Sequence, residues 1–217
     1  MHILLTDALT CPRCGPGFGL ILLAERTEER RVASGHLGCP NCRSQFPIRN
    51  RVADLRLGAS ASSASTDTAE SPDSARGGEG DAEAPVRLAA LMGLAGASGL
   101  ALIAGPGARH ASAVSALVPE LETIAVTDSA DPAGSAGERG VSRVLASGAG
   151  LPFRGGLRAA ALTGGADDAR LREALRVLAP GARLLVDAAP ADAAERLRGL
   201  GAEVLLDEDG VVVARAP

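Results

Sequence analysis

Four cysteines, all within the first 42 residues, constrain this chain more than any other feature. They form two Cys-x-x-Cys pairs, Cys11 with Cys14 in "CPRC" and Cys39 with Cys42 in "CPNC". The two pairs are separated by 24 residues. This spacing is typical of a zinc ribbon, in which each pair forms a tight turn that directs two thiolates at one tetrahedral ion. We therefore expect a small β module in which all four cysteines bind one zinc ion.

The expected zinc has a structural role. Four thiolates leave no open coordination position, so the metal contributes folding energy to a core too small to stand alone. Between the cysteine pairs, residues 19–25 and 31–37 predict a hairpin around the polar turn "RTEER". His36 is an alternative metal ligand, although its place in the second strand favours an exposed residue.

The residues around the cysteines carry a resemblance to a known family. "LLTDALTCPRCG" and "GCPNCRSQFPIRNRVADL" are similar to the small zinc-ribbon family of methyltransferase activators, over about residues 2–57. The similarity includes the flank Phe46-Pro47-Ile48, which is followed by a basic turn and a short apolar end. It implies a module that binds a partner methyltransferase or precedes a methyltransferase domain in the same chain.

Four arginines of this module, Arg43, Arg49, Arg51 and Arg56, have two interpretations. They form either a solvated face that offsets the charge of a Zn(Cys)4 centre or a contact surface for RNA or a partner protein. The formal net charge of the chain is −4, so the composition carries no strong nucleic-acid signal. All 22 basic residues are Arg, which excludes chemistry that needs a lysine.

The composition changes sharply at residues 58–84, "GASASSASTDTAESPDSARGGEGDAEA". This stretch has almost nothing to bury, which predicts a disordered acidic linker between a zinc-ribbon domain at 1–57 and a second domain at 85–217. A surface loop within one domain is the alternative. The start of the chain predicts no signal peptide, and no apolar run predicts a membrane span, so we expect a cytoplasmic protein.

From residue 85 onward, apolar runs alternate with helical patterns, which predicts an α/β fold with a doubly wound, mostly parallel sheet of about seven strands. The last two strands are joined by "EDG", a tight hairpin that makes them antiparallel. The expected strands lie at 100–104, 123–127, 142–146, 157–163, 183–188, 202–207 and 211–215, and the expected helices at 86–95, 108–118, 167–178 and 191–200.

This layout resembles the class I S-adenosylmethionine (SAM) dependent methyltransferases over about residues 88–215. "LPF" at 151–153 and "LREALRVLAPGARLLVDA" at 171–188 are similar to segments of that family, in which a helix ends in Arg-x-Leu-x-Pro-Gly before the fifth strand. Pro180 blocks continuation of the helix, and Gly181 supplies a positive φ. The resemblance implies a SAM site at the carboxyl ends of the strands.

The resemblance assigns possible SAM-binding roles to five residues. Gly105, Pro106 and Gly107 form the turn after the first strand, where the backbone passes close to the methionine part of the cofactor. Asp128 follows the second strand, where a carboxylate takes the ribose hydroxyls. Ser147 stands where the family usually has an acid near the adenine, and it retains one hydrogen-bonding group.

Other positions depart from the family pattern. Arg109 replaces the third glycine, and Ile103 replaces the usual acid of the first strand. Arg158 and Ala159 replace the usual Phe-Asp of the fourth strand. Losing a charged hydrogen bond costs about 1.5–3 kcal/mol, so these changes predict a partly degenerate site.

Two hypotheses follow, and neither assigns a catalytic residue. The first is a zinc-ribbon-fused SAM-dependent methyltransferase acting on an RNA, a protein or a small molecule. Methyl transfer needs little beyond alignment of the acceptor with the methyl group, so a missing acid or base does not exclude it. The alternative is a non-catalytic scaffold or activator that binds a partner protein through the ribbon and the methyltransferase-like domain.

Overall fold

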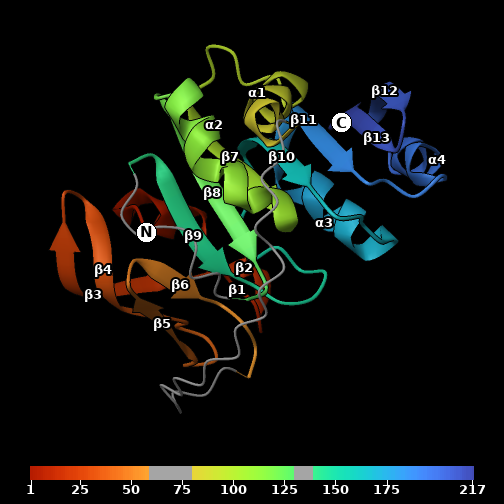
Figure 1. The fold of residues 1–217 in the computed structure, drawn as a ribbon. Helices are drawn as coiled ribbons and strands as arrows, with labels where there is room; N and C mark the ends of the chain where they lie inside the picture. Colours follow the sequence, from red (N-terminus) through yellow and green to blue (C-terminus); the bar gives the residue numbers. More distant parts are fainter. Residues whose placement is uncertain (59–79, 130–138) are drawn as a thin grey trace, which may run out of the picture.

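The computed structural model describes residues 1–58, 80–129 and 139–217; for residues 80–82 it defines the backbone only (Figure 1). The predicted linker at 58–84 lies largely outside these ranges. Its last residues differ from the prediction, because 80–84 form the first part of a helix that runs to Leu91. Among the described helices, none is long and apolar enough to cross a membrane.

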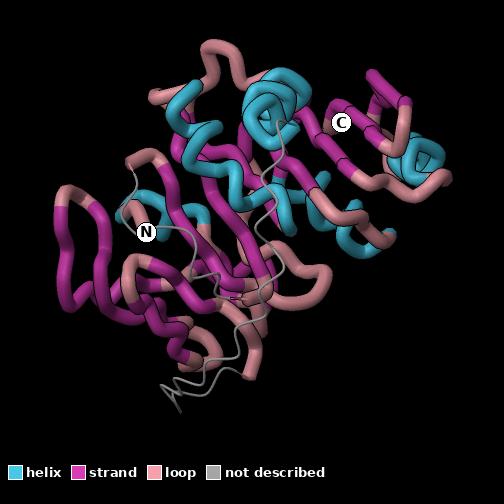
Figure 2. The backbone as a smooth tube through the Cα atoms, in the orientation of Figure 1, coloured by secondary structure: helices cyan, strands magenta, loops and turns pink. Residues whose placement is uncertain are grey.

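One mixed sheet of eleven strands runs through most of the described chain (Figure 2). Its order is β12-β13-β11-β10-β7-β8-β9-β6-β5-β4-β3. The strands are β3 (Ile21–Glu28), β4 (Arg31–Gly38), β5 (Gln45–Arg49), β6 (Val52–Asp54), β7 (Gly99–Ala104), β8 (Leu121–Thr127), β9 (Val141–Leu145), β10 (Leu157–Leu162), β11 (Leu178–Asp187), β12 (Glu203–Glu208) and β13 (Val211–Arg215).

The strands from β7 onward confirm the expected α/β fold. β9, β8, β7, β10 and β11 pair in parallel, and β13 lies antiparallel between β11 and β12. The helices are α1 (Gly80–Leu91), α2 (Ala111–Leu117), α3 (Asp168–Val177) and α4 (Ala193–Gly199), with 3-10 turns η1 (Ile3–Ala8) and η2 (Pro106–His110). β11 begins earlier than expected, because the Pro180-Gly181 segment extends the strand rather than preceding it.

The cysteine module also has the expected hairpin, β3 with β4, and a two-stranded sheet of β1 (Thr10–Cys11) and β2 (Gly15–Gly19). Its last strand, β6, pairs in parallel with β9, with Asp54 opposite Leu145. This pairing joins the module directly to the α/β sheet. The boundaries at 57 and 85 therefore separate segments whose strands share one sheet.

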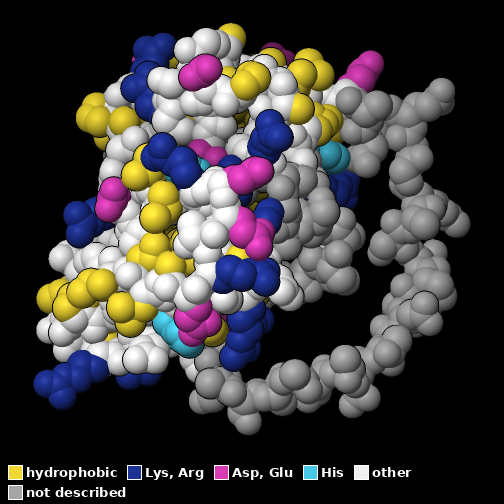
Figure 3. All heavy atoms as spheres, turned by 90° about the vertical axis from the view of Figure 1, so that its left-hand side faces the viewer, with side chains coloured by type: hydrophobic (Ala, Val, Ile, Leu, Met, Phe, Trp, Pro, Cys, Tyr) yellow, Lys and Arg dark blue, Asp and Glu magenta, His cyan; other side chains and the backbone are white. Residues whose placement is uncertain are grey.

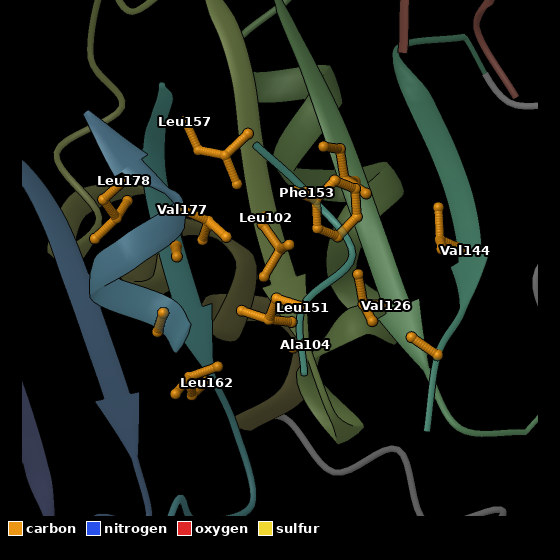
Figure 4. Packing of buried hydrophobic residues seen from close by; sticks show 14 of the residues in the cluster. Leu102, Ala104, Val126, Val144, Leu151, Phe153, Leu157, Leu162, Val177 and Leu178 are labelled. Carbon is orange, nitrogen blue, oxygen red and sulfur yellow. The ribbon is translucent and has the colours of Figure 1, made fainter. Parts of the chain in front are cut away.

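Two hydrophobic clusters cover the two faces of the sheet. Helices α1 and α2 pack on one face, over residues such as Ile103. On the other face, α3, α4 and the N-terminal segment pack together, and this cluster contains residues of both the cysteine module and the α/β sheet. Phe153 is fully buried within it and lies beside Leu102 and Val126 (Figure 4). Small aliphatic side chains fill most of both clusters, as the low aromatic content requires.

Candidate functional site

The four cysteines converge as predicted. Their sulfur atoms all lie within 4.8 Å of one another, and none forms a disulfide. The Sγ–Sγ distance is 3.7 Å from Cys11 to Cys42 and 3.8 Å from Cys14 to Cys39. A zinc ion bonded tetrahedrally to four sulfurs at about 2.3 Å holds them about 3.8 Å apart. The cluster therefore has the dimensions of a four-thiolate metal centre.

Neighbouring groups support the second cysteine pair. The backbone N–H of Cys39 donates to the carbonyl of Ser44 at 2.9 Å, which closes the turn. The Ser44 hydroxyl lies 3.3 Å from Cys42 Sγ, and hydrogen bonds from Ser44 lower the pKa of Cys42 to about 6. Burial raises the pKa of Cys11 to about 12. A bound cation favours the thiolate form at both positions.

His36 lies outside this cluster. It is on β4, and its Nδ1 lies 3.4 Å from a carboxylate oxygen of Glu25. Among the described residues, the cysteine cluster contains no fifth candidate ligand.

The arginines of the module are only partly available to a ligand. Arg51 pairs with Glu28, and Arg56 pairs with Asp54. Arg43 and Arg49 are exposed.

The glycine turn follows β7 at the carboxyl edge of the parallel strands. Gly105 has φ +88° and ψ −158°, a conformation essentially confined to glycine. A Cβ at Gly105 would lie 2.1 Å from the carbonyl oxygen of Thr163, and a Cβ at Gly107 would lie 2.7 Å from Thr163 Cγ2. Both glycines are therefore required by contact with Thr163, the residue that follows β10.

The Thr163 side chain also forms hydrogen bonds with backbone groups of this turn. Its hydroxyl oxygen accepts a hydrogen bond from the backbone N–H of Gly107 at 2.7 Å and donates to the carbonyl of Ala104 at 2.8 Å. On the other side, a Cβ at Gly164 would lie 3.0 Å from Pro106 Cδ. The segment after β10 thus packs onto the turn. The Gly107 N–H, a donor available to a ligand carboxylate in an open turn, is already hydrogen-bonded to Thr163.

Two positions that the sequence marked as departures, Ile103 and Arg109, lie beside this turn. Ile103 is fully buried in the cluster under α1 and α2, so it offers no polar group to a ligand. Ala159 is also fully buried. The side chain of Arg109 donates through Nε to Nε2 of His110 at 3.1 Å. Ile103 therefore leaves the first strand without the expected acid beside the turn, whereas Ala159 pairs with Ala101 and lies away from the carboxyl end of β10.

The next two parallel strands, β8 and β9, are followed by more exposed residues. Asp128 is exposed directly after β8, and Ser147 is exposed shortly after β9. Nothing lies within 4 Å of a Cβ built at Gly148. Arg170, on α3, donates through Nη1 to the carbonyl of Gly148 at 2.9 Å, and this nitrogen also lies within 3.4 Å of the next two carbonyls. Partial burial lowers the pKa of Arg170.

The strand order decides the class of the fold. Counted along the chain from β7 to β13, the seven strands lie in the order 3-2-1-4-5-7-6, with the seventh antiparallel. The glycine turn follows the first strand, at the point where the order reverses. The chain carries a class I methyltransferase-like fold joined to a four-cysteine ribbon.

Solved methyltransferases are similar in fold. The antibiotic-resistance methyltransferase Kmr is 18% identical, with a TM-score of 0.44, over 61% of this chain and 92% of the Kmr chain. The Burkholderia thailandensis 1,6-didemethyltoxoflavin-N1-methyltransferase, solved with 1,6-didemethyltoxoflavin and S-adenosylhomocysteine, is 18% identical, with a TM-score of 0.47, over 63% of this chain and 80% of that chain.

A third similarity is to a complex of the Haloferax volcanii Trm112 methyltransferase activator with a methyltransferase. It has 15% identity and a TM-score of 0.45, over 64% of this chain and 98% of the matched chain. No family model matches the sequence, and no curated protein matches it.

Two residues near the edge, Thr163 and Arg170, were not singled out by the sequence, and neither was the contact of Arg56 with Asp128. Thr163 had a signal, because it ends an apolar strand and precedes two glycines. Arg170 and Arg56 had none, since their contacts join segments far apart in the chain. Arg176, by contrast, belongs to the matched motif, and it donates to the carbonyls of Leu151 and Phe153, which fixes the "LPF" segment.

Proposed function

We propose that this protein is a non-catalytic scaffold or activator with a methyltransferase-like fold and a structural zinc centre. The observation that carries the proposal is the contact of Thr163 with the glycine turn. SAM carries a carboxylate and an ammonium group at its methionine end, and both need polar partners in a buried site. At this end of the edge, Gly107 N–H is bonded to Thr163, and Ile103 replaces a carboxylate.

The ligand content of the purified protein tests this proposal. The protein is denatured, and the released SAM and S-adenosylhomocysteine are quantified by mass spectrometry against the protein concentration. We expect no more than trace amounts of either compound. Close to one equivalent per chain would contradict the proposal and support an occupied cofactor site.

The second candidate function is SAM-dependent methyl transfer to an RNA, a protein or a small molecule. Asp128 favours it, because its exposed carboxylate follows β8 in the position that the resemblance assigns to ribose binding. In this case Asp128→Asn removes SAM affinity, since a neutral amide cannot form the charge-assisted bonds to the ribose hydroxyls. Retention of the same affinity in Asp128→Asn would exclude this mode of binding.

The zinc centre is the third part of the proposal. Cys11, Cys14, Cys39 and Cys42 would hold the ion, and the ion would supply fold stability only, because four thiolates leave no open position. Elemental analysis of the freshly purified protein should give one zinc per chain. Cysteines that hold a metal instead of forming disulfides are typical of a reducing compartment, which supports a cytoplasmic location.

A protein is the partner that the surface favours over RNA. The ribbon exposes the apolar side chains Phe18, Ile21 and Leu23 by 41%, 55% and 55%, and hydrophobic side chains are visible on that side of the molecule (Figure 3). Of the four ribbon arginines that form the candidate contact surface, Arg51 and Arg56 are already paired with acids. RNA binding that weakens steeply with salt, and that is lost in Arg43→Ala with Arg49→Ala, would instead favour RNA.

A further inference from the structure

Arg56 connects the ribbon to Asp128, the residue directly after β8. Because β6 runs parallel to β9, its carboxyl end lies at the same edge of the sheet as the ends of β9 and β8. Arg56 follows β6 by two residues, and Leu55, between them, donates its backbone N–H to the carbonyl of Leu145 at 2.8 Å. The chain of the ribbon thus continues along the edge of the methyltransferase-like fold.

Asp54 fixes the orientation of the Arg56 guanidinium. Arg56 donates through Nε to Asp54 Oδ1 at 2.8 Å and through Nη2 to Oδ2 at 2.6 Å, a two-pronged contact. The backbone N–H of Arg56 also donates to Oδ1, at 3.2 Å. Burial alone would raise the pKa of Asp54, but its hydrogen bonds with Arg56 hold that pKa below the ordinary value. The two side chains remain an ion pair at neutral pH.

The third nitrogen of the Arg56 guanidinium contacts the residue that follows β8. Arg56 Nη1 donates to the backbone carbonyl of Asp128 at 3.2 Å. In the sheet, β9 lies between β6 and β8, so this hydrogen bond spans the end of a whole strand. The charge of Asp128 also contributes to raising the pKa of Arg56. Asp54 fixes two nitrogens of Arg56, and the third nitrogen therefore holds the backbone of Asp128 in place.

We propose that Arg56 is a positioning residue through which the ribbon sets the place of Asp128 at the carboxyl edge. Within the described part of this edge, Asp128 is the one acid at a position that the resemblance assigns to the cofactor. The position of its carboxylate then depends on a residue from the cysteine module, with Asp54 as the anchor. This inference does not rest on the proposed function, because it holds whether the edge binds SAM or is empty.

Nuclear magnetic resonance of the full chain tests this inference. The readouts are the carbonyl ¹³C shift of Asp128 and the amide ¹⁵N shift of Ser129, the two nuclei of the peptide group that accepts the hydrogen bond. We expect both signals to move in Arg56→Ala. They should move in the same direction in Asp54→Asn, because the neutral amide no longer fixes the guanidinium.

The matched control is Arg26→Ala, another ribbon arginine, whose side chain is 69% exposed and lies 3.4 Å from Glu28. It should leave the Asp128 and Ser129 signals unchanged. Unmoved signals in Arg56→Ala, with the ribbon signals at their native positions, would overturn the proposal. If Arg56→Ala does not fold, unmoved signals in Asp54→Asn would overturn it equally. Signals that move as far in Arg26→Ala would show a general effect of charge and also overturn it.

Discussion

Gly105 is a residue whose identity follows from the packing of the chain itself. Its backbone conformation is costly for any residue with a side chain. A Cβ at this position would lie only 2.1 Å from the carbonyl oxygen of Thr163. We predict that Gly105→Ala lowers the free energy of unfolding by about 2–4 kcal/mol, because strain and a clash with backbone add. Urea denaturation followed by circular dichroism measures this difference.

Gly150→Ala is the control for this prediction. Gly150 is exposed in the segment after β9, and a Cβ there meets nothing within 4 Å. Its substitution should change the free energy of unfolding by no more than about 0.5 kcal/mol. Equal losses in Gly105→Ala and Gly150→Ala would show that the contact with Thr163 does not require the glycine.

Glu173 provides a prediction of pH dependence. Hydrogen bonds from Arg176 lower the pKa of Glu173 below its ordinary 4.5, against a smaller opposing effect of burial. A carboxylate whose pKa is lower in the folded state stabilises the fold above its unfolded pKa, and that stabilisation is lost as the pH falls toward the folded pKa. Its contribution should therefore be present at pH 7 and decline below about 4.5.

Thermal unfolding of the wild type and of Glu173→Gln, from pH 7 to below pH 4.5, measures how much the Glu173 carboxylate stabilises the fold. The variant should be less stable at pH 7, and the difference from wild type should shrink as the pH falls below 4.5. Protonation of the cysteines affects both proteins alike and cancels in the comparison. A difference that stays constant with pH would contradict the assignment.

At the scale of elements, a buried ion pair joins β4 to β8, and a hydrogen bond from the same arginine joins β4 to β9. Arg31, at the start of β4, donates to both carboxylate oxygens of Glu122 on β8, at 3.0 and 2.9 Å, and to the carbonyl of Val141 at 2.7 Å. The hydroxyl of Ser142 donates to the same carboxylate at 2.6 Å. The two side chains are 10% and 15% exposed, so either charge left alone would be poorly solvated.

Breaking this pair should therefore be costly. We predict that Arg31→Met destabilises the chain by about 3–5 kcal/mol, because the Glu122 carboxylate is left without its partner. Arg31→Met combined with Glu122→Leu should regain most of the loss, since no buried charge remains. Arg215→Ala, which breaks an exposed pair with Glu203, should cost no more than about 1 kcal/mol. If the double variant is no more stable than Arg31→Met, the burial of an unpaired charge is not the cause.

Most single elements could be predicted from the sequence, because apolar periodicity and turn residues are local signals. The seven strands from β7 onward and the hairpin of β3 with β4 are examples. The pairing of β6 with β9 could not be predicted, because β6 has only three residues and its partner lies beyond the acidic segment at 58–84. For the same reason, no local signal indicated that Arg56 reaches Asp128. The convergence of the four cysteines was predictable from their paired spacing, whereas the exclusion of His36 from the cluster needed the structure.

At the scale of the whole molecule, the ribbon and the α/β segment share one sheet and one buried cluster, so we expect them to unfold together. Residues such as Leu5 and Ile48 of the ribbon lie in the same buried cluster as Phe153 and Leu162. We predict that Cys39→Ser, which removes one ligand of the proposed zinc centre, lowers the melting temperature of the whole chain in a single transition. Amide hydrogen exchange should show loss of protection in β4 and in β9 together.

Two separate transitions would contradict this view of the molecule. In that case the ribbon would lose structure in Cys39→Ser while β8 and β9 kept the protection of the wild type. The ribbon would then be an independent domain that only rests against the sheet.

The central claim is that the carboxyl edge keeps the shape of a cofactor site without binding the cofactor. Isothermal titration of the zinc-loaded protein with SAM and with S-adenosylhomocysteine tests it most directly. We predict no binding heat up to about 1 mM of either ligand, because Thr163 holds the Gly107 amide and Ile103 replaces a carboxylate. Saturable binding of either ligand with a Kd below about 1 mM would contradict it.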